Sequence, residues 1–148
     1  MKYAIAAAAF MAVSSGAASA ATIVNSFDND AEGWTVSGGN LTWQATGGNS
    51  GGYISIADGT GTFMQASSGS SFLGNLSAFD GGMFSFDAIQ TAQGTSGSYL
   101  SGFGIVRLSG GGITASLDFF TVYPTNTWQT ASVLFDAATW GLSQLAWD

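Results

Sequence analysis

Apolar and polar positions alternate along most of the chain after residue 21. In the segment MFSFDAIQ, Phe84, Phe86 and Ala88 share one side of an extended chain, and Ser85 and Asp87 share the other. The segment ITASLDF alternates in the same way. Strict alternation is typical of a strand with one face in a core and one face in water. A helical period hardly occurs, so the pattern predicts an all-β domain.

Nine strands are predicted, separated by turns rich in glycine, asparagine and aspartate. They are Thr22–Phe27, Trp34–Ser37, Leu41–Ala45, Tyr53–Ala57, Thr62–Ser67, Met83–Gln90, Gly102–Ser109, Ile113–Thr121 and Trp128–Phe135. The run Ser109–Gly112 predicts a hairpin turn, and Gly141–Trp147 is the one helix candidate. Short strands at this spacing indicate a two-sheet antiparallel sandwich.

The first twenty residues have the three parts of a secretory signal peptide. A short positive start is followed by the apolar run Ala4–Val13 and by the small-residue segment Ser14–Ala20. The apolar run is about half of the 20 residues that a membrane-spanning helix needs. We therefore expect cleavage after Ala20, a mature domain over residues 21–148, and a secreted location, extracellular or periplasmic.

Charge and composition narrow the classes of partner. Lys2 leaves with the signal peptide, so Arg107 is the single base of the mature chain against nine acids, a net charge of −8. Such a chain cannot neutralise phosphates, which argues against nucleic acid as a partner. It also lacks the basic patch that would hold an anionic membrane surface. Neutral ligands or cations are the favoured partners.

The residue types that are missing also exclude several chemistries. Without cysteine, histidine or a mature lysine, the chain has no serine–histidine triad, thiol nucleophile or Schiff-base lysine. A pair of carboxylates, as in glycosidases, is the remaining catalytic option. Most of the acidic residues fall in turns or on polar strand faces, so the sequence favours a domain that is not an enzyme and needs no cofactor.

One cluster of oxygen ligands could hold calcium. Asp28 and Asp30 flank Asn29 directly after the first mature strand. Calcium takes six to eight oxygen ligands from carboxylates and amides. A plain turn rich in aspartate and asparagine has the same composition, so both interpretations stay open, with Asp28 and Asp30 as candidate ligands for a structural calcium ion.

Exposed aromatic rings give the candidate ligand site. Trp43, Tyr99 and Trp128 lie where a ring could face solvent and offer a flat platform to a sugar. Arg107 is the fourth candidate, although an ion pair with Asp87 or Asp118 across a sheet is the alternative.

A longer stretch resembles the laminin B domain, also called laminin domain IV type A. The block FLGNLSAFDGGMFSFD, residues 72–87, carries the resemblance. It is supported by Phe27-Asp28 with Glu32-Gly33-Trp34, by Gly52–Ile56, and by the segment from Trp128 to Trp140. The resemblance implies a galactose-binding-like jelly roll without catalytic activity, found in matrix proteins and in exported bacterial proteins. It also implies a structural calcium at Asp28.

The sequence departs from the family pattern at the end of the chain. Members continue into a closing strand where this sequence stops at Asp148, so we expect the closing strand to be missing, and no sorting tail or membrane anchor is present in the sequence. The leading hypothesis is a secreted adhesion or glycan-binding module whose partners are extracellular polysaccharide or matrix proteins. The alternatives are a jelly-roll glycoside hydrolase or lyase, and a purely structural envelope protein.

Overall fold

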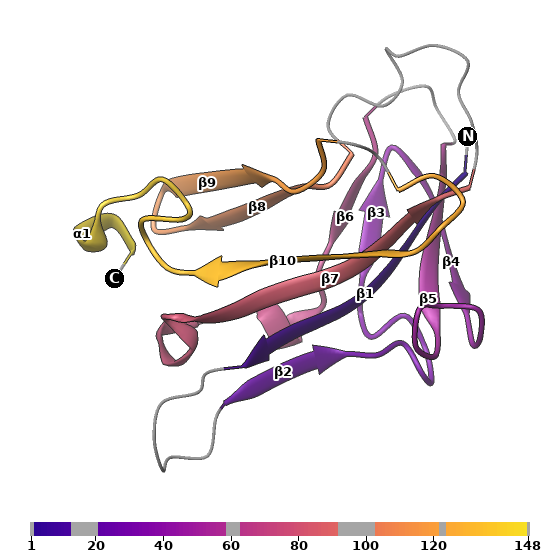
Figure 1. Cartoon of the computed structure of the whole chain (residues 1–148), viewed down its shortest axis with the longest axis horizontal. Helices are drawn as coiled ribbons and strands as arrows, with labels where there is room; N and C mark the ends of the chain where they lie inside the picture. The colour runs from indigo at the N-terminus through magenta and orange to yellow at the C-terminus, as the bar shows by residue number, and fades with distance from the viewer. Residues whose placement is uncertain (1, 13–20, 59–62, 92–102, 122–123, 148) are drawn as a thin grey trace.

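The computed structural model describes residues 2–12, 21–58, 63–91, 103–121 and 124–147. Ten strands account for most of them (Figure 1). They are β1 (Lys2–Ala12), β2 (Thr22–Asn25), β3 (Thr35–Ser37), β4 (Gly39–Gln44), β5 (Tyr53–Asp58), β6 (Gln65–Ser67), β7 (Gly82–Gln90), β8 (Ile105–Gly110), β9 (Ile113–Asp118) and β10 (Gln129–Phe135). Helical structure is limited to the 3₁₀ turns η1 (Ser70–Phe72) and η2 (Ser77–Phe79) and to α1 (Gln144–Trp147). Each of the nine predicted strands is present, shifted by a few residues at its ends.

The strands form three antiparallel sheets, which confirms the predicted all-β class. The main sheet has six strands in the order β10-β7-β1-β5-β4, with β2 paired to β1 beyond this path. Two smaller sheets pair β3 with β6 and β8 with β9. The β8–β9 sheet lies alongside β10 and β7, with α1 beyond its end (Figure 1). Within the described residues, no helix is long and apolar enough to cross a membrane.

The strand that the alternation does not predict is β1. It falls in the segment whose composition predicts a signal peptide, and it pairs antiparallel with β7 on one side and with β5 and β2 on the other. A strand at this position is internal to the sheet and pairs along both edges, except around Ala7 and Ala8, where the register with β7 shifts. The structure thus places residues 2–12 inside the main sheet.

The hairpin between β8 and β9 forms at the predicted glycine run. Gly110 pairs with Ile113, which leaves Gly111 and Gly112 as a two-residue loop. Both have a positive φ, 56° and 81°. A two-residue turn with positive φ at both positions matches the right-handed twist of the strands, and glycine adopts it without steric cost.

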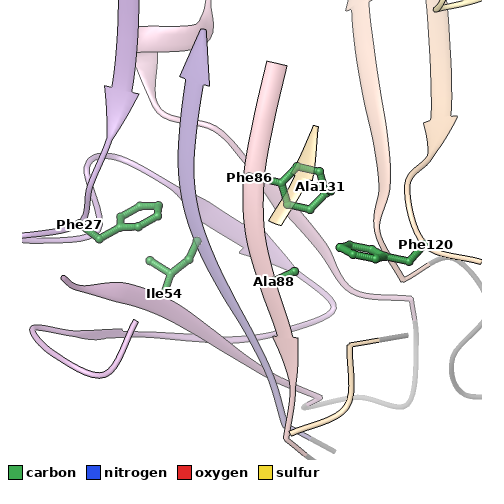
Figure 2. Close-up of a cluster of buried hydrophobic side chains, with 6 residues drawn as sticks. All are labelled: Phe27, Ile54, Phe86, Ala88, Phe120 and Ala131. Atoms are coloured by element: carbon green, nitrogen blue, oxygen red, sulfur yellow. The ribbon is translucent and has the colours of Figure 1, made fainter. Parts of the chain in front are cut away.

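The core lies between the main sheet and the β8–β9 sheet. Phe27 and Ile54 are fully buried, and Phe86 packs edge-on against Phe119 and Phe120 at ring-centroid distances of 5.0 and 5.8 Å. Figure 2 shows the ribbon of β1 passing between Ile54 on β5 and Ala88 on β7. Buried residues of β5, β7 and β10, namely Ile54, Phe86, Ala88 and Ala131, thus form one cluster with Phe27 and Phe120.

A second cluster of buried side chains joins the end of β10 to the C-terminal segment. Phe135 and Trp140 are almost fully buried, and Trp147 of α1 packs on Phe135 at 4.7 Å. The Trp147 indole also donates a hydrogen bond to Asp80 at 2.8 Å. These contacts anchor the short terminal helix, which the sequence predicts over Gly141–Trp147.

Asp136 begins the turn that leads from β10 to Trp140, and this turn gives a pH-dependent prediction. The Asp136 carboxylate accepts a hydrogen bond from the Thr139 amide at 2.7 Å. Bonds from the Thr139 amide and hydroxyl lower the pKa of Asp136 below its ordinary value. A lowered pKa stabilises the fold above the unfolded-state pKa, and this contribution disappears as the pH falls through the folded-state pKa.

We therefore expect Asp136→Ala to unfold at lower denaturant than the wild type at neutral pH. The difference should shrink as the pH falls through the folded-state pKa of Asp136, below which the carboxyl group is protonated in both states. Urea melts at several pH values measure it. The matched variant Asp136→Asn keeps an acceptor oxygen but has no carboxyl group to titrate. Its own free energy of unfolding should therefore not show this pH dependence. A wild-type advantage that stays constant with pH would contradict the assignment.

Candidate functional site

The main sheet has one face away from the core, here called the outer face. Residues directly opposite in register share a face of the sheet. Because Trp43 pairs with Ile54 and Ala131 pairs with Phe86 on the core side, the alternate positions form the outer face. Its members are Asn40, Thr42 and Gln44 of β4, Tyr53 and Ser55 of β5, Ser85 and Asp87 of β7, and Thr130 and Ser132 of β10.

Polar side chains dominate this outer face. Thr42, Gln44, Thr130 and Ser132 are exposed and carry hydroxyl or amide groups. Amide and hydroxyl groups can both donate and accept hydrogen bonds. The face therefore offers neutral hydrogen-bonding groups on strands at both ends of the sheet order.

An aromatic pair lies on the outer face. Tyr53 begins β5, Trp128 immediately precedes β10, and their rings meet edge-on at a centroid distance of 5.6 Å. In the sheet order, β7 and β1 lie between β5 and β10, so this contact spans the two central strands. The Trp128 indole donates a hydrogen bond to the Gly47 carbonyl at 3.1 Å, which fixes the ring to the β4–β5 loop. Both side chains are half-buried, so part of each ring faces solvent.

The carboxylate on this face is held by a neighbour. Asp87 is 7% exposed, and its carboxylate accepts a hydrogen bond from the Thr130 hydroxyl directly opposite on β10. A buried carboxylate that is bonded in this way positions the β7–β10 pair. It is poorly placed to meet a substrate in solvent.

The four predicted ligand residues are distributed differently from the prediction. Trp128 lies on the outer face, whereas Trp43 lies on the core side and donates a hydrogen bond to the Phe27 carbonyl at 2.7 Å. Trp43 is therefore not part of the ligand platform and belongs to the packing around Phe27. Tyr99 lies outside the described residues. Tyr53, which is not among the predicted ligand residues, lies beside Trp128.

Arg107 lies on a different surface. It is exposed on β8, opposite Ser116 of β9, in the alternation phase that faces away from Val106 and Leu108. The described residues include no ion pair between Arg107 and a carboxylate. Asp87 is on the main sheet with Thr130 as its partner, so it is not the predicted partner of Arg107. The structure does not bring Arg107 to the aromatic pair.

In the loop that carries the predicted calcium ligands, side-chain carboxylates accept hydrogen bonds from backbone amides of the same loop. The Glu32 carboxylate accepts a hydrogen bond from the Phe27 amide at 2.6 Å, and the Asp30 carboxylate accepts one from the Glu32 amide at 2.6 Å. Asp28 and Asp30 are both exposed. Among the residues that the structure describes, no three acidic side chains come together as a metal site. Calcium at Asp28 and Asp30 stays a prediction of the sequence.

Comparison of the chain with protein-family models, with curated proteins and with solved structures finds no match.

Proposed function

We propose that this protein is a secreted, non-enzymatic adhesion or glycan-binding module, similar to laminin B domains in its jelly-roll, galactose-binding-like architecture. The observation that carries the proposal is the outer face, where the Tyr53–Trp128 pair lies among exposed hydroxyl and amide groups. In this proposal, the protein acts at a cell surface or in a matrix.

The chemistry of the outer face suits a neutral carbohydrate. Half-exposed aromatic rings offer apolar surface to the CH groups of a sugar. Thr42, Gln44 and Thr130 can exchange hydrogen bonds with sugar hydroxyls. The net charge of −8 for residues 21–148 disfavours anionic glycans, since the chain supplies one base for nine acids.

Two features of the sequence support export and adhesion. The first is the signal-peptide pattern of residues 1–20, which directs a chain out of the cytoplasm. The second is the laminin-B resemblance of residues 72–87, a family of surface and matrix modules. Extracellular polysaccharide is the partner that fits both features and the polar outer face.

The carboxylates favour binding over hydrolysis. Glycosidases place two carboxyl groups about 5.5 Å or about 6.5 to 9.5 Å apart across the scissile bond. Among the described residues of the outer face, Asp87 is the one carboxylate, and it is buried and bonded to Thr130. We therefore propose that a bound polysaccharide stays intact.

A glycan array tests this function. The wild type should bind at least one neutral glycan, and Trp128→Ala should weaken the binding at least tenfold, a loss of about 1.4 kcal/mol. Phe63→Ala is the matched control, because Phe63 is 84% exposed and lies outside the outer face. Its affinity should equal that of the wild type.

Two results would overturn the proposal. Array signals at background for all neutral glycans would favour a purely structural role. Shortening of the bound polysaccharide, lost on an Asp→Asn substitution, would favour a hydrolase or lyase.

A further inference from the structure

The most distinctive position in the sheet is the one that β1 occupies. Ile5 of β1 has Ile54 of β5 as its register partner on one side and Ala88 of β7 on the other. Ile54 is fully buried and Ala88 is 1% exposed. Toward its other end, β1 keeps β7 on one edge and takes β2 as its partner on the other. Residues 2–12 therefore complete the hydrogen-bonding of three other strands.

The same residues belong to the segment that the proposed export pathway removes. After cleavage behind Ala20, β7 would keep β10 as a partner and β5 would keep β4, but each would have an empty inner edge. β2 would lose its one pairing partner within the described sheet. Unpaired backbone groups at an edge this close to the core are costly, because water reaches them poorly.

The gap cannot close by a simple shift of the two neighbours. β5 and β7 both run antiparallel to β1, so they are parallel to each other and about two strand spacings apart, roughly 9.6 Å. The start of β5 is fixed against Phe27 at Gly52, and β7 is fixed against the β8–β9 sheet through Phe86 and Phe119. Closing the gap would break one of these two packed contacts.

We propose that the position of β1 is a strand-acceptor site, which takes an extended segment of a partner polypeptide once the signal peptide is removed. This inference rests on the cleavage in the proposed function. The partner segment runs antiparallel to β5 and β7 and matches β1 in chemistry, an apolar strand of about eleven residues with six alanines. Backbone hydrogen bonds to both edges would supply affinity, as in strand addition to other sheets.

Exchange of the strand tests the site in the full chain. A specific protease sequence replaces Ser14–Ala20, the protein is folded, and the link between β1 and β2 is then cut. A fluorescein-labelled peptide with the sequence of residues 2–12 is added in excess and followed by anisotropy and native mass spectrometry. We expect it to replace β1 as a one-to-one complex.

The control peptide carries Ile5→Pro. Proline cannot donate a hydrogen bond within a strand, so its binding should be at least about tenfold weaker. If the cut chain keeps its circular dichroism after β1 has dissociated but binds neither peptide, the gap closes by itself and the proposal is wrong. Equal binding of both peptides would also overturn it. Neither result depends on glycan binding, so the proposed function is tested separately.

A disulfide trap checks the register, since the chain has no native cysteine. Lys2 pairs with Ala57 of β5, and Ala57 pairs on its other side with Asn40 of β4. Paired strand positions lie within the Cα separation that a disulfide spans. A peptide with Lys2→Cys should cross-link to Ala57→Cys under oxidised glutathione, and not to the matched Asn40→Cys. The reverse preference would contradict an internal acceptor site.

Discussion

Gly52→Ala is expected to destabilise the fold by about 3 kcal/mol, the upper part of the usual range for overpacking. A Cβ atom at Gly52 would lie 1.9 Å from the Phe27 carbonyl oxygen and 2.9 Å from the Gln44 carbonyl oxygen. Both neighbours are backbone atoms, so no side-chain rotation relieves the overlap. The Phe27 carbonyl also accepts the Trp43 indole hydrogen bond, which holds it in place. Urea melts of the two proteins give the difference.

The matched control is Gly110→Ala at the end of β8. A Cβ atom there meets no atom within 4 Å, so the free energy of unfolding should change by less than about 0.5 kcal/mol. If Gly52→Ala melts together with the wild type, then the close approach of the β5 start to Phe27 is absent in solution. That result would remove the packing that fixes Tyr53 on the outer face.

Phe86→Ala should cost about 3 to 5 kcal/mol, the usual range for removing a buried aromatic ring. Phe86 is 7% exposed and contacts the rings of Phe84, Phe119 and Phe120. Its loss leaves a cavity between the main sheet and the β8–β9 sheet. Phe63→Ala removes the same ring from an exposed position and should change the stability by less than about 0.5 kcal/mol. If the two substitutions change the free energy of unfolding by similar amounts, then Phe86 is not part of the core in solution.

The strands after residue 21 could be predicted from the alternation of apolar and polar residues. The structure confirms a single buried face in β9, where Ala115 is buried and Ser116 and Asp118 are exposed, whereas both faces of β7 are buried from Phe86 to Gln90. β1 could not be predicted in this way. Six alanines in eleven residues carry little contrast between faces, so no strand pattern is visible, and the same composition predicts a signal peptide.

The aromatic site could be predicted only in part. Trp128 was identified as a candidate, but a single sequence does not reveal its contact with Tyr53 across two strands. The sequence does carry a signal for Tyr53. It alternates along β5 with Ile54 and Ile56, which are buried, so Tyr53 lies on the opposite face of the sheet. The signal for Trp43 lies in its alternation with Thr42 and Gln44, which puts it on the same face as Leu41. In the structure this is the core side, where Leu41 pairs with Ile56 and Trp43 with Ile54.

We propose that a neutral glycan binds on the outer face at Tyr53 and Trp128. A titration of the ¹⁵N-labelled protein with a hexasaccharide selected from the array tests it most directly. We expect shifts of the Trp128 indole resonance and of the amides of Gln44, Tyr53 and Thr130, with the β8–β9 amides around Arg107 unchanged. Shifts that gather at Arg107 and Ser116 while the Trp128 indole stays fixed would contradict the claim.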